Sequence, residues 1–463
     1  AIRDSELHEL DADSFTAVLR ADAELGISVA RELAAQLQAS ARAEPPPARP
    51  AVIAVRRLDP SLDAARFARR LAAALEPFGA AAILDAGDTA PDDRAGAVDR
   101  AEQQHAHVIL VDDGADRDWS AFCQRESDRT LLLATASTAW HGVPHGLDLV
   151  VVGAVAPGDV DRLLEAFEPR AHHLVDEGDG GASVERVARR IIGRSLGLVF
   201  SGGGARGFAH IGVLDVLAED GFVVDRLGGC SMGALIAAMA ASGWSAPEIR
   251  DRCSDELVRR SPFNDYTLPR VALIRSRKAG RMLERIFGDR RIEELPLPLF
   301  TVSADLLSSR QVVFRRGPLV EAVGTSMCIP GIAPPVPRLG ALLVDGGVLN
   351  NLPVDELAVA REGPIVAVDV IRRMEVGEGD GEPRLPSILE TLARATVLAS
   401  VERAERNREL AALVVSPDVQ HVPLRGFSHL DAAVEAGRQA ARAALDAGGR
   451  ESLLALLQAP AGA

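Results

Sequence analysis

Short apolar runs alternate with helical patterns along much of the chain. Between residues 51 and 175 the apolar runs are AVIAVRRL, GAAAILDAG, AHVILVDDG, TLLLATA and LDLVVVGA, and turn-forming or charged residues bound each of them. Segments such as DAARFARRLAAALEPFG, in which apolar residues recur at helical spacing, separate some of these runs. This alternation predicts an α/β layer with a parallel sheet.

The same alternation continues beyond residue 195. LGLVFSGGGARGFAHIGVLDVLAEDG predicts a strand, a glycine-rich loop and a helix, and VVDRLGGCSMGALIAAMAASG predicts the next strand and helix. A strand–helix–strand unit of this kind brings the carboxyl ends of two parallel strands to one edge of the sheet. The glycine loop and the residues after the second strand are therefore expected to lie together.

Three stretches rich in proline, glycine or acidic residues have the composition of linkers or long loops, namely residues 39–50, 176–183 and 376–386. We expect a short helical segment at residues 1–44 and a smaller α/β domain at 45–178, which serves as a scaffold or regulatory module. A second α/β domain, ending in helices, is expected at 188–463. In the smaller domain, Asp112, Asp113, His172 and His173 are interpreted as strand-end and surface residues rather than as ligands.

Composition narrows the class of protein. The chain has 463 residues, of which 47% are hydrophobic, and a net charge of −15, which argues against a general nucleic-acid-binding protein. No apolar run approaches the roughly 18 residues of a membrane-spanning helix. The polar start and the four scattered cysteines favour a cytoplasmic protein, with peripheral contact at the inner membrane face left open. No cluster such as H-E-x-x-H predicts a metal, and no cofactor is expected.

The candidate nucleophile is Ser231, in the pattern G-x-S-x-G. Gly229 and Gly233 permit a sharp turn between strand and helix, so that the serine hydroxyl protrudes. Cys230 is expected to be a buried strand residue. The pattern alone is a weak signal in a chain with 41 glycines, but a glycine loop one strand–helix–strand unit upstream strengthens it.

The glycine loop has two interpretations. Gly202, Gly204 and Gly207 satisfy G-x-G-x-x-G, and Asp225 further along is a candidate ribose-binding acid of a dinucleotide site. However, Asp225 lies near the beginning of its strand, whereas that acid belongs at the end. An acyl-transfer site needs backbone N–H donors for an oxyanion, and glycine N–H groups can approach a ligand closely. Three roles are open for Arg206: steadying the loop, meeting a substrate phosphate, or lying on the surface without a specific role.

Two arrangements could supply the base that takes the proton of Ser231, a triad with a histidine or a dyad with an aspartate. A hydrolase triad would use Asp369 with His421 or His429, in the order serine, acid, histidine. Alternatively, Asp345 ends an apolar run immediately before two glycines and can accept the serine proton directly. Considered by itself, Asp345 is equally suited to capping a turn.

Four motifs together resemble the patatin-like phospholipase family: GGGARGFAHIGVL, GCSMGAL, TSMCIPGIAPPV and DGGVLNNLPV. The resemblance covers roughly residues 195–423. It implies an α/β fold and a Ser–Asp dyad of Ser231 and Asp345, acting on acyl esters of phospholipids or lysophospholipids. The implied oxyanion loop comprises Gly202, Gly203, Gly204, Ala205, Arg206 and Gly207. Ser201 stands where patatins often have Asp, which matches the subgroup that resembles neuropathy target esterase.

Residues 3–37 resemble the end of a cyclic-nucleotide-binding domain, without its glycine-rich phosphate-binding cassette. We therefore expect this chain not to bind a cyclic nucleotide. Residues 259–291 are rich in arginine, mixed with Phe263, Tyr266, Leu273 and Ile274. This mixture suits an anionic lipid surface or a phosphate headgroup, although a solvated helix face is the alternative. The segment TSMCIPGIAPPVPRLG is expected either to line an acyl-chain pocket or to pack as a core loop.

Overall fold

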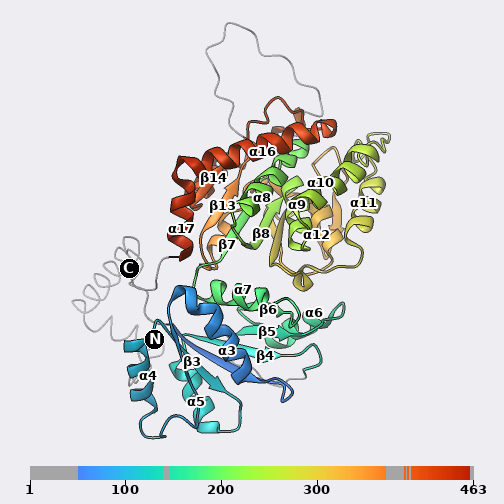
Figure 1. Cartoon of the computed structure of the whole chain (residues 1–463). Helices are drawn as coiled ribbons and strands as arrows, with labels where there is room; N and C mark the ends of the chain where they lie inside the picture. The colour runs from blue at the N-terminus through green and yellow to red at the C-terminus, as the bar shows by residue number, and fades with distance from the viewer. Residues whose placement is uncertain (1–50, 139–145, 372–390, 393, 396–397, 459–463) are drawn as a thin grey trace, which may run out of the picture. The chain divides into compact units, whose positions relative to one another are not determined.

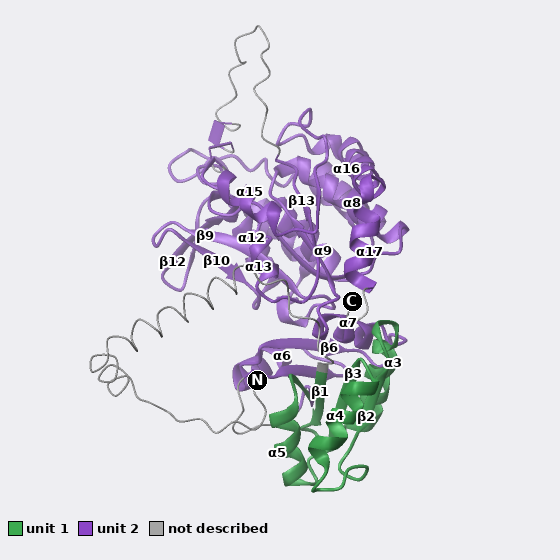
Figure 2. Cartoon of the chain, turned by 90° about the vertical axis from the view of Figure 1, so that its left-hand side faces the viewer, with its two compact units in different colours: residues 1–132, 460–463 green, residues 133–459 purple. Residues whose placement is uncertain are grey.

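The computed structural model describes residues 51–138, 146–371, 391–392, 394–395 and 398–458 (Figure 1). The segment that resembles the end of a cyclic-nucleotide-binding domain lies outside these residues, as do the linkers expected at 39–50 and 376–386. The chain divides into two compact units, with the boundary after Leu132 (Figure 2). The domain limits expected from sequence stay a prediction.

The first unit contains parallel strands of the kind that its apolar runs predict. Strands β1 and β2 both pair in parallel with β3. Its elements are β1 (Ala51–Arg57), α3 (Ala64–Leu75), β2 (Ala81–Leu84), α4 (Arg94–Gln104), β3 (His107–Asp112), α5 (Arg117–Glu126) and the start of β4 (Arg129–Ala134). All six residues of β3 are buried, as expected for a strand covered on both faces.

The second unit begins with a pair of parallel strands, one of which was not anticipated. The elements here are β5 (Asp148–Val152), α6 (Asp159–Phe167), β6 (Ala171–Val175) and α7 (Ala182–Ile191). Strand β6 contains His172 and His173 and pairs in parallel with β5. His173 is only 4% exposed, so the interpretation of this histidine as a surface residue is wrong.

The main sheet of the second unit is mostly parallel, with the strand order β11-β12-β9-β8-β7-β13-β14, and β10 pairs with β9 off this path. The parallel strands are β7 (Leu196–Phe200), β8 (Val224–Cys230), β9 (Leu299–Asp305), β13 (Ile365–Val368) and β14 (Leu413–Val415). The antiparallel strands are β10 (Arg310–Phe314), β11 (Val336–Arg338) and β12 (Ala341–Asp345).

Helices cover both faces of this sheet. They are α8 (Ala209–Glu219), α9 (Met232–Ala241), α10 (Ala246–Cys253), α11 (Arg277–Phe287), α12 (Leu319–Ser326), α13 (Asp355–Ala358), α15 (Val401–Glu409), α16 (Leu430–Ala444) and α17 (Arg450–Gln458). Leu198 and Phe200 of β7 join the core beneath α8 and α9, while Val199 joins a second core with Leu357 of α13. Helices α8 and α16 lie side by side (Figure 1). The α/β fold with a mainly parallel sheet is thus confirmed.

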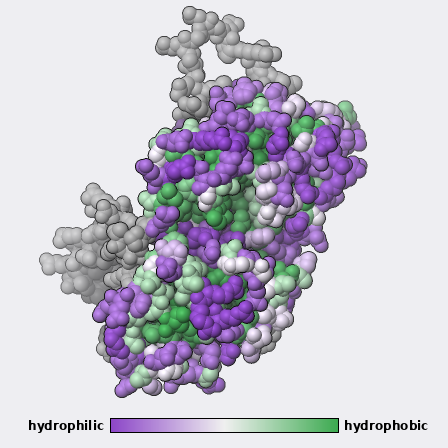
Figure 3. All heavy atoms as spheres, in the orientation of Figure 1, coloured by the Kyte–Doolittle hydropathy of each residue, from purple (hydrophilic) through white to green (hydrophobic). Residues whose placement is uncertain are grey.

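Polar residues cover most of the face drawn in Figure 3, and apolar residues gather in patches between them. Within the described ranges, no helix is both long enough and apolar enough to span a bilayer.

Candidate active site

Ser231 forms a strained turn between β8 and α9. Its backbone has φ 53° and ψ −121°, a conformation that residues other than glycine rarely adopt. A Cβ atom on Gly229 would lie 2.6 Å from the carbonyl carbon of Gly233, and one on Gly233 would lie 2.4 Å from the carbonyl oxygen of Phe200. Only glycine fits at these two positions. The turn therefore has the sharp strand-to-helix geometry that G-x-S-x-G predicts.

Strand β9 brings Ser231 and Asp345 together. In β9, Val302 pairs with Cys230 of β8, and the next residue, Ser303, pairs with Asp345 of β12. Strand β10 pairs with β9 along both of these positions. Because a strand has only two edges, β8 and β12 must share the edge opposite β10. Strand β12 thus continues where β8 ends, and the aspartate comes to lie beside the serine.

Asp345 is buried and held by hydrogen bonds. Its Oδ1 atom accepts a hydrogen bond from the N–H of Gly347 at 2.8 Å and one from the Cys230 thiol at 3.5 Å. The residue as a whole is 3% exposed. Burial raises the pKa of Asp345 to about 6, although hydrogen bonds from Ser231, Gly347 and Cys230 oppose this rise. A carboxylate poised near neutral pH is suited to general-base work.

Ser326, the last residue of α12, holds the backbone of the turn at Ser231 by hydrogen bonds. Its hydroxyl accepts the backbone N–H of Ser231 at 2.9 Å and donates to the carbonyl oxygen of Val302 at 2.6 Å. Ser326 is fully buried. Sequence reasoning missed this role, although the residue lies inside the TSMCIPGIAPPV motif.

Replacing Ser326 with alanine should leave the buried N–H of Ser231 without an acceptor. We expect Ser326→Ala to cost about 1–3 kcal/mol of unfolding free energy, and to lower kcat about tenfold or more because the nucleophile loses its alignment. Thermal melts and steady-state assays would measure both effects. Ser303→Ala is the matched control, because the Ser303 hydroxyl donates to Thr325 at 2.9 Å and not to the turn at Ser231. Equal losses of kcat in the two variants would contradict a positioning role for Ser326.

The glycine loop lies against the nucleophile. A Cβ atom on Gly202 would lie 3.1 Å from the Cβ of Ser231. The N–H groups of Gly202, Ala205 and Arg206 already donate to backbone carbonyl oxygens, at 3.2, 2.9 and 3.2 Å. Within the described part of the chain, the N–H groups of Gly203 and Gly204 have no acceptor. Among the described residues, the N–H groups of Gly202, Ala205 and Arg206 are thus already engaged, whereas those of Gly203 and Gly204 are not.

Two polar side chains brace the glycine loop. Asn351 donates its amide to the carbonyl oxygen of Gly202 at 3.3 Å and accepts the N–H of Gly202 at its own carbonyl at 3.2 Å. Arg206 donates to the carbonyl oxygen of Val422 at 2.8 Å and to the side chain of Gln420 at 3.1 Å. Of the three roles considered for Arg206, these contacts favour steadying the loop. Apart from its place in the DGGVLNNLPV motif, nothing in the sequence indicates this role of Asn351.

The structure does not bring the residues of the alternative triad together. Asp369 follows β13 and accepts the guanidinium of Arg408 at 3.0 Å. His421 and His429 are exposed, and neither lines the cavity that contains Ser231. His210 is fully buried, and burial lowers its pKa to about 4 while its Nε2 atom lies 2.9 Å from the carbonyl oxygen of Ser201. The strand pairing instead places Asp345 beside Ser231.

The acid required by a dinucleotide site lies at the wrong edge of the sheet. Asp225 is the second residue of β8, and Ser231 follows the last. Its carboxylate accepts both Arg189 donors, at 2.7 and 2.9 Å, and the N–H of Leu196 at 3.2 Å. It therefore cannot reach a ligand at the glycine loop.

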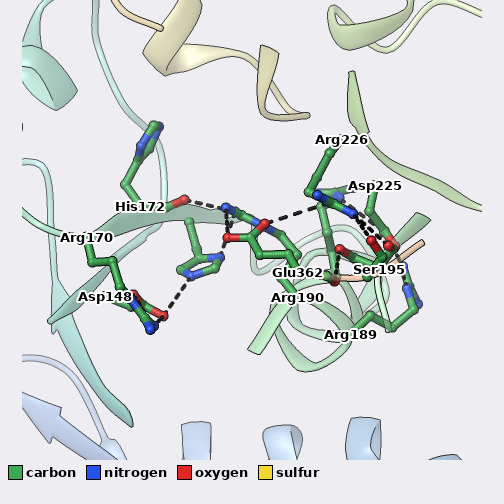
Figure 4. A network of polar contacts seen from close by, with 12 residues as sticks. Asp148, Arg170, His172, Arg189, Arg190, Ser195, Asp225, Arg226 and Glu362 are labelled. Atoms are coloured by element: carbon green, nitrogen blue, oxygen red, sulfur yellow. Dashed lines mark hydrogen bonds and ion pairs between the residues drawn. The ribbon is translucent and has the colours of Figure 1, made fainter. Parts of the chain in front are cut away.

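Asp225 belongs to a polar network that includes the two histidines considered as ligands (Figure 4). Arg190 of α7 bonds Glu362 at 2.8 Å and the Nδ1 atom of His173 at 3.0 Å, and the other ring nitrogen of His173 faces Asp148 at 3.7 Å. Burial keeps the pKa of His173 below its usual value. In the described residues, no group of three His, Cys, Asp or Glu side chains is arranged to hold a metal ion. The network is a structural link between β6, α7 and the main sheet.

Ser231 and Asp345 line a cavity of about 760 Å³. Gly203 and Gly204 form part of one wall. Most other lining side chains are apolar, and they include Phe263, Ile274, Met282, Leu283, Val320, Met327, Ile329, Ile332, Val336 and Phe427. The segment TSMCIPGIAPPVPRLG contributes several of these residues, so it lines the pocket rather than packing only in the core. The volume is in the range of small-molecule sites.

Comparison with known proteins identifies a matching family model and relatives of substantial identity. The patatin-like phospholipase family model matches residues 198–358. An uncharacterized NTE family protein of Mycobacterium tuberculosis is 35% identical over 485 residues, covering 96% of this chain and 81% of that protein. The chain belongs to the NTE family of patatin-like phospholipases. The family predicted from the four motifs is confirmed, and patatin-like phospholipases are typically hydrolases.

Other relatives match this patatin-like phospholipase over a shorter span. Human patatin-like phospholipase domain-containing protein 6 is 36% identical over 221 residues, which is 45% of this chain and 16% of that protein. The neuropathy target esterase of Drosophila melanogaster is 36% identical over 203 residues, covering 42% of this chain and 14% of that protein. Among solved structures, VipD of Legionella pneumophila covers 55% of this chain at 14% identity, and 67% of VipD is covered, with a TM-score of 0.32.

Proposed function

We propose that this protein is a serine esterase that hydrolyses acyl esters of phospholipids or lysophospholipids through a dyad of Ser231 and Asp345. The observation that carries the proposal is the position of a strained serine beside a buried aspartate, in the wall of an apolar cavity. The cavity accepts an acyl chain, and the glycine loop offers donors at the reacting end.

In the first half of the reaction, the hydroxyl of Ser231 attacks the ester carbonyl and Asp345 takes its proton. The negative charge that develops on the carbonyl oxygen is held by the N–H groups of Gly203 and Gly204, with help from the amino end of α9. The tetrahedral intermediate then collapses. The alcohol leaves with the proton returned by Asp345, and an acyl-enzyme remains.

In the second half, water replaces the alcohol. Asp345, again ionised, takes a proton from the water, and the resulting hydroxide attacks the acyl-enzyme. The same N–H groups hold the second oxyanion. Collapse releases the fatty acid and returns the proton to Ser231.

A panel of esters tests this proposal. The panel comprises lysophospholipids, diacyl phospholipids and p-nitrophenyl esters of increasing chain length, and a fluorophosphonate probe reports the nucleophile. We expect covalent labelling of Ser231 and hydrolysis that improves as the acyl chain lengthens to fill the cavity. An unlabelled protein that cleaves no member of the panel would overturn the proposal.

The pH dependence follows from the burial of Asp345. The pKa of this carboxyl is about 6, and the base must be ionised, so kcat/KM should be constant above neutral pH and fall about tenfold per pH unit well below pH 6. A profile on a soluble p-nitrophenyl ester from acidic to mildly alkaline pH would show this limb. An acid limb near pH 4, the range of an ordinary aspartate, would contradict a buried base. A histidine ordinarily titrates near ~6.5, so substitutions, rather than this profile, separate dyad from triad.

A further inference from the structure

A loop of residues 266–274 projects from the wall of the cavity on a fixed base. Tyr266 and Ile274 pair across its base as an antiparallel bridge, and the N–H of Thr267 donates to the carbonyl oxygen of Leu273 at 3.0 Å. The N–H groups of Leu273 and Ile274 donate to the backbone of residues 331 and 332, at 3.1 and 3.0 Å. Tyr266 and Ile274 also line the cavity. The base of the loop is therefore part of the cavity wall.

The apolar side chains at the tip of this loop are exposed to solvent. Leu268 is 71% exposed, Val271 is 72% exposed and Pro269 between them is exposed as well. Tyr266 at the base is 57% exposed. Single exposed apolar residues are ordinary, but several in one short loop with a fixed base mark a contact surface.

The loop is also basic, in a protein of net charge −15. Arg270 lies at the tip, and Arg275 and Arg277 follow the base. In the described ranges no ion pair neutralises these three arginines, whereas Arg285, later in the same basic segment, pairs with Glu256 at 2.5 Å. Between residues 257 and 283, Asp265 is the only acidic residue in the sequence. The arginines are thus free to meet an anionic surface.

Further exposed apolar residues lie at the carboxyl end of the parallel strands, which is the end of the sheet where Ser231 lies. Strand β9 runs parallel to β8, so the turn after it, with Leu307 at 69% exposed, lies beyond the end where Ser231 sits. Strand β12 is antiparallel to β9 and begins at that end, and Leu339 just before it is 96% exposed. The opposite end of the sheet carries Val223 before β8 and Val359 before β13, which are also exposed.

From these observations we infer that the 266–274 loop docks the protein on an anionic lipid bilayer. Leu268 and Val271 insert among the acyl chains, and Arg270, Arg275 and Arg277 contact lipid phosphates. The inference rests on the proposed function, because it supplies the source of the substrate. Since the base of the loop lines the cavity, a lipid drawn from the bilayer passes along apolar side chains towards Ser231.

The test compares two double variants, each of which replaces two exposed aliphatic residues with serine. Leu268→Ser with Val271→Ser removes the apolar tip, and neither residue lines the cavity. Val223→Ser with Val359→Ser, at the opposite end of the sheet, is the matched control. Binding is measured by co-sedimentation with phosphatidylcholine vesicles, with and without phosphatidylglycerol. Activity is measured on a soluble short-chain ester and on lipid held in the same vesicles.

We expect the unaltered protein to bind the anionic vesicles, more weakly as salt is raised, and to bind the zwitterionic vesicles poorly. The tip variant should bind the anionic vesicles about tenfold or more weakly and lose a similar factor in activity on vesicle-held lipid. Its activity on the soluble ester should not change, and the control should match the unaltered protein throughout.

Three results would overturn the inference. One is equal binding by the tip variant and the control, and another is a soluble esterase that binds no vesicles. The third is a dimer, seen by sedimentation velocity, that the tip variant dissolves, because the loop would then bind a second copy of the chain. Vesicle binding by a protein that hydrolyses no ester would contradict the proposed function but would support the docking surface.

Discussion

Ser231→Ala should abolish esterase activity while leaving the fold intact. The variant removes the nucleophilic oxygen, and loss of such a group lowers kcat by several orders of magnitude, on the order of 10⁴ or more. Alanine retains the Cβ atom, so the strain at φ 53° is the same in both proteins, and the glycines that permit the turn are untouched.

The measurement is kcat/KM on a soluble p-nitrophenyl ester, together with fluorophosphonate labelling and a thermal melt. Ser428→Ala is a suitable control, because Ser428 is exposed and does not line the cavity. Activity of Ser231→Ala within about tenfold of the unaltered protein would remove this serine from the mechanism.

The sharp turn at Ser231 could be predicted because the requirement for it is local. A sharp turn between a strand and a helix requires small residues on both sides of the serine, and Gly229 and Gly233 show that requirement in the sequence itself. The glycine loop was predictable for the same reason. Its place beside Ser231 followed from the parallel strands of a strand–helix–strand unit, whose carboxyl ends lie at the same end of the sheet.

Which aspartate lies beside Ser231 could not be predicted from the residues alone, because it depends on strand order. Asp345 and Asp369 both follow short apolar runs. Only the pairing of β12 with β9 places Asp345 beside Ser231, while Asp369 is paired with Arg408. The family resemblance pointed to Asp345, and the geometry supplies the physical reason.

Hydrogen bonds between the site and residues distant in the chain could not be predicted from the sequence either. Ser326 and Asn351 each bond a backbone group far away in the chain, and nothing in their own neighbourhood indicates which group. The strand β6 was missed because its apolar run is interrupted by His172 and His173. The burial of His173 depends on Arg190 and Asp148, which come from other elements.

Asp345 illustrates a trade between stability and activity. Its pKa in the folded protein, about 6, lies above the 3.8 of an unburied aspartate. Between these values the folded state holds more protons than the unfolded state, so the stability from this group falls as pH rises through that window. Above pH 6 the buried carboxylate costs up to about 3 kcal/mol. A base that the fold disfavours in its charged form is also one that accepts a proton readily.

The decisive test of the dyad is Asp345→Asn. This variant removes the proton acceptor with almost no change in side-chain volume, and it also removes the buried charge. We expect activity on a soluble ester to fall about as far as in Ser231→Ala, because the two residues act as one unit. The melting temperature at pH 8 should equal or exceed that of the unaltered protein, and the difference should shrink as pH is lowered towards 4.

The two exposed histidines provide the contrast. His421→Ala and His429→Ala should each retain activity within a few-fold, about the scatter expected for surface substitutions that touch neither nucleophile nor base. In a triad, by contrast, imidazole takes the serine proton, so one histidine variant would be nearly inactive and Asp345→Asn would lose only what the turn at Gly346 and Gly347 contributes. A folded but inactive histidine variant beside an active Asp345→Asn enzyme would replace the dyad with a triad. The cavity wall argues for the first outcome, because Asp345 lines it together with Ser231 and neither histidine does.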